Sequence, residues 1–183
     1  SGSTITAQRF WAEFNTDVGM LQVGRAPQHW GLGLVHHSGD GVSDRYQSTG
    51  DTFRLVAKFG NFSFIPATVK YNYGNSIAGA CTAFAAPNCT YAAGGMGLTE
   101  YQIGLKYENV DEDFEGGVNF VRRLAGAQAN SVWLNNTGGG LNYTIWDIYM
   151  RKRAGKFNIG VEAPIYTGEM QGVPYSAFSI ATE

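Results

Sequence analysis

The sequence predicts an all-β protein: an antiparallel up-and-down transmembrane β-barrel, or part of one, with about 8–9 strands in a single domain over residues 1–183. Apolar and polar residues alternate in segments of about ten residues, the length that a tilted strand needs to cross a bilayer. Tight turns and long loops alternate between these segments. Charged residues make up only 15% of the chain, compared with about 25% in an average soluble domain.

The composition argues against several other classes of protein. The net charge is -2 and the isoelectric point is about 5.9, so no basic field attracts nucleic acid. The chain has no run of about 18 apolar residues, which excludes a membrane-spanning helix. The first residues, SGSTITAQRFW, lack the basic and apolar segments of a signal peptide. We therefore expect a cytosolic protein, or a mature or partial chain.

Period-two alternation predicts the strands in order along the chain. They cover about residues 4–15, 19–26, 52–60, 62–73, 98–109, 114–124, 141–153 and 156–166, and a ninth begins near Tyr175. The alternation is clearest in 98–109, where Tyr101, Ile103 and Leu105 share one side. It is weaker in 4–15 and 141–153, where charged and apolar residues share a side. Pro66 interrupts 62–73 and predicts a bulge or an edge position.

The connections predict how the strands are arranged. Short turns are expected at 16–18, 60–61, 110–113 and 154–155, and long loops at about 27–51, 74–97, 125–140 and 167–174. Loops longer than about 12–15 residues are uncommon in compact domains. Because short and long connections alternate along the whole chain, all the long loops would emerge at one end of the sheet. This layout is typical of transmembrane barrels.

The two sides of the predicted strands are assigned to lipid and to a hydrated interior. A Lys or Arg on the lipid side near the bilayer midplane costs about 2–4 kcal/mol, so the side without charges is taken as lipid-facing. The residues expected to face lipid are Phe53, Leu55, Phe59, Ile65, Val69, Tyr71, Tyr101, Ile103, Leu105, Tyr107, Phe157, Ile159 and Val161. The residues expected to face the lumen are Arg54, Lys58, Lys70, Glu100, Lys106, Glu108, Glu115, Arg123, Asp147, Arg151 and Glu162.

Three short motifs mark the segment from Arg9 to Gly60. They are Val23-Gly24-Arg25, Trp30-Gly31-Leu32-Gly33-Leu34 and Ser48-Thr49-Gly50-Asp51-Thr52. With these motifs the segment, about a quarter of the chain, resembles bacterial outer-membrane porin-like proteins, among them an uncharacterised proteobacterial porin-like family. The resemblance implies a barrel in the bacterial outer membrane and no catalytic residues.

Other candidate sites are weak in this sequence. The residues His29, His36, His37 and Asp40 cluster in one loop, where we favour ordinary loop residues over a metal site. A local disulfide between Cys81 and Cys89 is favoured over two unrelated thiols, and it would indicate an oxidising compartment. Neither a catalytic motif nor a cofactor-binding motif is present, so we expect no enzyme and no cofactor.

Three functions remain open from the sequence. The first is a porin-like barrel that allows small solutes to diffuse through a hydrated lumen. The second is a structural oligomeric barrel or open sheet that forms a ring and organises or encloses membrane lipid without transport. The third is a soluble extracellular β-sandwich that acts as a binding module. As partners we expect membrane lipid, and either further copies or the remainder of a longer barrel chain, because nine strands do not make the even number that bacterial barrels have.

Overall fold

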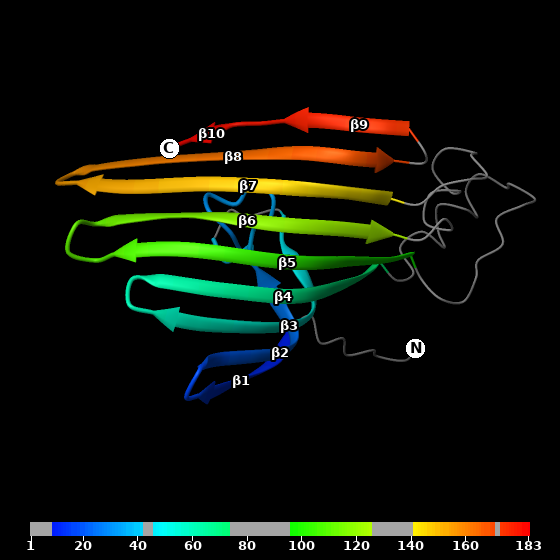
Figure 1. The fold of residues 1–183 in the computed structure, drawn as a ribbon, viewed down its shortest axis with the longest axis horizontal. Helices are drawn as coiled ribbons and strands as arrows, with labels where there is room; N and C mark the ends of the chain where they lie inside the picture. Colours follow the sequence, from blue (N-terminus) through cyan, green and yellow to red (C-terminus); the bar gives the residue numbers. More distant parts are fainter. Residues whose placement is uncertain (1–8, 42–45, 74–95, 126–140, 171–172) are drawn as a thin grey trace, which may run out of the picture.

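The computed structural model describes residues 9–41, 46–73, 96–125, 141–170 and 173–183, and these form one antiparallel sheet (Figure 1). The strands are β1 (Phe10–Thr16), β2 (Gly19–Gln28), β3 (Ser48–Phe59), β4 (Phe62–Tyr73), β5 (Met96–Asn109), β6 (Phe114–Ala125), β7 (Leu141–Ala154), β8 (Phe157–Met170), β9 (Val173–Phe178) and β10 (Ala181–Thr182). No helix that is long and apolar enough to span a membrane is present among the described residues.

Each strand pairs with its neighbours in the chain. The spatial order runs from β1 to β8 in sequence, with β9 and β10 both on the far side of β8, and every pairing is antiparallel. The predicted all-β, antiparallel up-and-down architecture is therefore confirmed. No pairing between described residues joins β1 to β9 or β10, so the described sheet is open.

β9 and β10 are two parts of one strand. Phe178 lies opposite Ile165 and Ala181 lies opposite Glu162, which is the same register on β8. The register continues to the last residue, because Glu183 and Gly160 exchange backbone hydrogen bonds of 3.0 and 3.2 Å. The break falls opposite a proline of β8, which has no N–H to donate. The described sheet thus has nine strand positions side by side, and we call the last one, formed by β9 and β10 together, the ninth crossing.

Most predicted strands are found, with shifted ends. The first is observed from Phe10, and residues 4–8 lie outside the described part of the chain. The expected loop at 167–174 is wrong, because β8 continues to Met170 and β9 begins at Val173. The bulge or edge position expected at Pro66 is also wrong. Pro66 keeps its register with Ile103 in the middle of the sheet, and only the pairing toward β3 is interrupted there.

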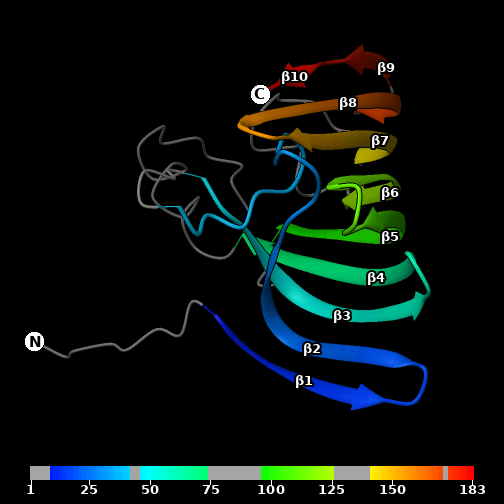
Figure 2. The same cartoon turned by 90° about the vertical axis from the view of Figure 1, so that its left-hand side faces the viewer.

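The sheet is strongly curved, and the segment between β2 and β3 lies inside the curve (Figure 2). We call the convex side the outer face and the concave side the inner face. Residues directly opposite each other in the register lie on the same face, so the pairings assign each strand position to one face. The 29–47 connection, of which 29–41 and 46–47 are described, covers part of the inner face and is called the β2–β3 loop.

Candidate functional site

The outer face is apolar and exposed over β3 to β8. Ile103 lies between Pro66 of β4 and Phe120 of β6, and the same row continues to Trp146 and Ile165. Large hydrophobic side chains that are exposed on this face are Phe53, Phe59, Phe62, Phe64, Tyr101, Ile103, Leu105, Val118, Trp146, Ile148, Met150, Phe157, Ile159 and Ile165. Among the described residues, nothing covers them. A contiguous apolar surface of this kind marks an interaction with another apolar phase.

Charged residues on the outer face of the described strands occur only near the two ends of the strands. Near the long connections they are Arg25, Asp51, Lys70, Arg122 and Glu169. Near the short turns the outer-face charge is Lys152 of β7, opposite Ile159. Between these two rims the outer face of the described strands carries no charged residue.

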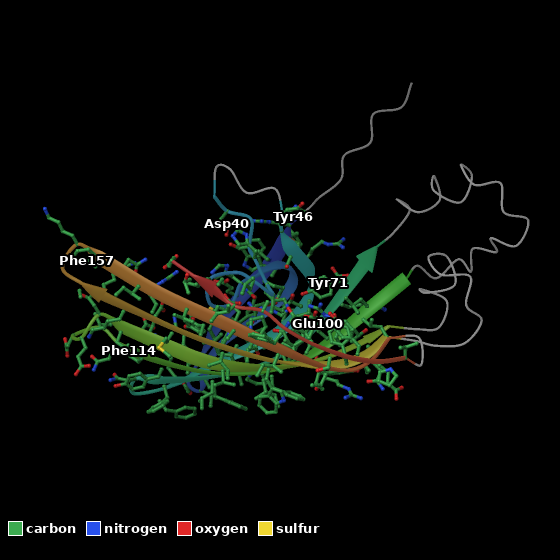
Figure 3. The ribbon with its side chains drawn as sticks, turned by 90° about the horizontal axis from the view of Figure 1, so that it is seen from above. Asp40, Tyr46, Tyr71, Glu100, Phe114 and Phe157 are labelled. Atoms are coloured by element: carbon green, nitrogen blue, oxygen red, sulfur yellow. The ribbon has the colours of Figure 1, made fainter. Side chains whose placement is uncertain are left out.

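Aromatic rings line the outer face at the short-turn rim. The rings of Phe62 and Tyr107 have centroids 5.0 Å apart, and those of Tyr107 and Phe114 are 6.1 Å apart. Phe114 and Phe157 both lie at the short-turn end of the sheet in Figure 3. Aromatic rings therefore border the apolar surface at this rim.

The face expected for four residues of β4 is wrong. Register places Ile65, Val69 and Tyr71 on the inner face, beside Gly104 and the other inner residues of β5. Lys70 lies on the outer face, beside Asp51 at the loop-side rim. β4 is apolar on both sides, because its outer positions include Phe62 and Phe64. Val69 has no exposed surface, because the inner face around it is packed.

The remaining assignments agree with the register as far as the grouping on two faces is concerned. On the outer face lie Phe53, Leu55, Phe59, Tyr101, Ile103, Leu105, Tyr107, Phe157, Ile159 and Val161. On the inner face lie Arg54, Lys58, Glu100, Lys106, Glu108, Glu115, Arg123, Asp147, Arg151 and Glu162. Contact with lipid or with a lumen stays a prediction.

A buried carboxylate on the inner face of β5 holds the β2–β3 loop. Glu100 is fully buried, and His36 Nε2 of the loop lies 2.8 Å from its Oε2. The same oxygen accepts hydrogen bonds from Gln102 Nε2 at 2.8 Å and from the Tyr71 hydroxyl at 3.2 Å. Arg123 forms an ion pair with Oε1. Figure 3 shows Tyr71 and Glu100 on the inner side of the sheet. Each oxygen of this carboxylate is therefore paired, as a buried charge requires.

A second carboxylate anchors the loop at β8. Glu162 is fully buried and accepts hydrogen bonds from the backbone N–H groups of Leu32 and Leu34. Asp147 of β7 is also fully buried, and neither of its oxygens has a hydrogen-bond partner among the described residues. The loop thus contacts β5 and β8, and it spans the inner face between them.

Trp30 docks on a surface made by two glycines. A Cβ at Gly104 or at Gly117 would lie 3.0 Å from the indole ring. The indole also packs edge-on against Tyr149, with centroids 5.2 Å apart. The sequence contained a signal for this contact, since a glycine inside a strand often marks a close approach. Period-two alternation does not reveal it, because a glycine carries no side chain that would mark a face.

Apolar side chains on the inner face gather near this loop. Val121, Tyr143 and Ile145 form a buried cluster on β6 and β7, and the partly buried Val35 of the loop packs against it. The inner face is therefore apolar in one area, beneath the loop. This local packing explains why apolarity alone does not distinguish the two faces.

The predicted histidine cluster divides between two environments. His36 is engaged by Glu100, whereas the rings of His29 and His37 lie 5.7 Å apart. Burial, and then the neighbouring His37, lower the pKa of His29. The hydrogen bond from Arg9, at 2.6 Å, lowers the pKa of Asp40. No three potential metal ligands converge within the described ranges. Cys81 and Cys89 lie outside the described residues.

The short-turn end of the inner face carries a network of partly buried ion pairs. Glu115 binds Lys106 at 2.8 Å and Arg151 at 3.0 Å, and Arg151 also binds Glu183 at 2.8 Å. A cavity of about 240 Å³ opens there, between Glu108 and Arg153. Charges of both signs thus surround a polar opening at this end.

Known proteins give no further assignment for this chain. No family model, curated protein or solved structure matches it.

Proposed function

We propose that the chain is part of a bacterial outer-membrane β-barrel whose outer face contacts lipid and whose inner face lines a hydrated lumen for passive diffusion of small solutes. The outer face carries this proposal, because its exposed apolar surface is free of charge between two polar rims. Such a band fits a layer of acyl chains, because that layer accepts apolar side chains and excludes charged ones.

The length of the apolar band supports a bilayer. On β5 it runs from Tyr101 to Tyr107, which is about 20 Å at about 3.3 Å per residue. On β8 it runs from Phe157 to Ile165, about 26 Å by the same rise. The outward apolar band of membrane barrels is about 25 Å tall.

The inner face supports a polar lumen. Its ion pairs and its opening at the short-turn end carry charges of both signs, and mixed charges along a pore give weak ion preference. The β2–β3 loop lies across this lumen and narrows it. A soluble sandwich would instead need a second apolar layer over the outer face, and the described residues provide none.

The packed loop also favours a second candidate, a structural membrane sheet without transport. Trp30 and His36 are buried on the inner face, and the loop occupies interior space that a channel would leave open. The sheet would then organise or enclose lipid without a conducting lumen. This candidate shares the lipid-facing surface and differs in the lumen.

Conductance separates the two candidates. The full chain, refolded in detergent and added to planar bilayers, is expected to give discrete steps of conductance with weak ion preference. Liposomes that contain it should also swell in small sugars. Protein that inserts into the bilayer but neither conducts nor admits sugars would contradict the diffusion function and leave the structural candidate.

A further inference from the structure

The two edges of the sheet lack partners among the described residues. β1 pairs with β2 alone, and all seven of its residues are exposed. β9–β10 pairs with β8 alone. An unpaired backbone group in hydrocarbon costs several kcal/mol. If the outer face contacts acyl chains, as proposed above, both edges must be covered by further strands.

The ninth crossing extends along most of β8, so it leaves a long edge of the sheet and does not cover it. It follows β8 from Met170 to Gly160. Phe178 and Ile180 are 73% and 62% exposed, and Phe178 lies on the outer face opposite Ile165. Its edge is therefore about as long as the other strands, and its outer side carries large apolar residues as theirs does.

Strand direction restricts what the partner can be. β1 runs from the long-loop end to the short-turn end, because a tight turn joins it to β2. Every pairing is antiparallel, so the ninth crossing runs in the same direction as β1. Among the described residues, a second copy with the same orientation in the membrane offers only these two edges. It would pair with β1 in parallel, unlike every pairing within the sheet.

We propose that an odd number of further strands, not supplied by the edges of a second copy, completes the sheet, and that the strand beside β1 runs from the short-turn end to the long-loop end. Antiparallel pairing continues across both edges in this arrangement, and it is slightly more stable per residue than parallel pairing. The proposal rests on the proposed location in a membrane.

The edge residues define the chemistry of the strand beside β1. Phe10, Ala12 and Phe14 lie on the outer face, so the partner's outward positions are apolar. Glu13 lies on the inner face, and its Oε1 accepts hydrogen bonds from Trp11 Nε1 at 3.0 Å and Gln22 Nε2 at 2.9 Å. A basic or amide side chain opposite Glu13 complements its second oxygen, because opposite charges across strands attract.

Photo-cross-linking measures the direction of the partner strand. The photoreactive residue p-benzoylphenylalanine replaces Trp11 or Asn15, one at a time, in the full chain in its membrane. Both positions are on the inner face of the edge strand. The same residue at Trp146, on the outer face between two paired strands, is the control, and its cross-links to protein should stay within β6 and β8. Irradiation and peptide mass spectrometry then identify each cross-linked position.

The order of the cross-links decides the outcome. We expect the site reached from Asn15 to precede the site reached from Trp11 in the partner sequence, within a segment that alternates apolar and polar residues. Cross-links to residues 173–183 of a second copy would overturn the proposal. The opposite order, with the site reached from Trp11 before the site reached from Asn15, would also overturn it, as would the absence of any cross-link to a further strand. The readout is independent of conductance. A protein with antiparallel cross-links that does not conduct contradicts only the diffusion function.

Discussion

The outer and inner faces of the same strands carry apolar residues for different reasons. On the outer face, Ile103 and Ile148 are half-exposed in a field without charges. On the inner face, Val69 and Ile145 are fully buried beside Glu100 and the other paired charges. The arrangement of charges therefore identifies the face, while apolarity alone does not.

A buried charge on the inner face should be the most costly to remove. Glu100→Ala leaves Arg123 and His36 without their shared carboxylate, and breaking a buried pair costs about 3–5 kcal/mol. Equilibrium unfolding in lipid vesicles should show this loss. The matched control is Glu108→Ala on the same strand, which is 44% exposed and should cost no more than about 1 kcal/mol. Equal losses would contradict the buried network.

A new charge on the outer face comes next. Ile103→Arg places a cation within the apolar band and should destabilise the folded protein in bilayers by about 2–4 kcal/mol. Ile103→Leu keeps the apolar surface and should be nearly neutral. Asn158→Arg, on the inner face near Glu183, tests an added charge on the other side. Urea titrations in vesicles compare the three, and similar tolerance of both arginines would break the contrast between faces.

The docking of Trp30 gives a smaller effect. Gly104→Ala places a Cβ 3.0 Å from the indole, and overpacking of this kind costs about 1–3 kcal/mol. In the Trp30→Ala background the same change should cost much less, because the clashing ring is gone. A double-mutant cycle measures this coupling. Additive costs would show that the glycine serves another purpose.

Acid should weaken the β2–β3 loop slightly. Burial lowers the pKa of His29 from its ordinary value of 6.5, so the unfolded loop binds the proton more tightly. Neutral His29 therefore stabilises the folded loop in full above pH 6.5, and this contribution is lost as the pH falls from 6.5 through the lowered pKa of His29. The protection of residues 30–39 against hydrogen exchange, taken relative to the intrinsic exchange rate at each pH, should therefore decrease on acidification below pH 6.5. His29→Gln should remove this part of the pH dependence, and an unchanged profile would refute the assignment.

The sequence predicts the strands well because period-two alternation is a local signal. It predicts the segment 98–109 almost to its ends, since Tyr101, Ile103 and Leu105 alternate with polar residues. It fails for β4, where Phe64 and Val69 make both sides apolar and the choice depends on contacts with other strands. Pro66 misleads for a related reason, because only one of its two neighbouring ladders is interrupted.

The inner site was less predictable than the strands. Its side chains Glu100 and Glu162 were expected on the polar face, but their role as anchors of the loop was not. The contacts join Leu32 to Glu162 and His36 to Glu100, across 130 and 64 residues of sequence. A loop without periodicity gives no local sign of where it packs. The glycines beneath Trp30 were the available clue.

Quenching of tryptophan fluorescence by brominated lipid measures which face of the sheet contacts acyl chains. Two single-tryptophan proteins are compared in bilayers, one retaining Trp146 and one retaining Trp30, with phenylalanine at the other tryptophan positions. Trp146 is 47% exposed on the outer face, whereas Trp30 is 7% exposed on the inner face. Lipid brominated in the acyl chains should quench Trp146 strongly and Trp30 weakly. Trp146 fluorescence that is no more quenched than that of Trp30 would contradict a lipid-facing outer surface.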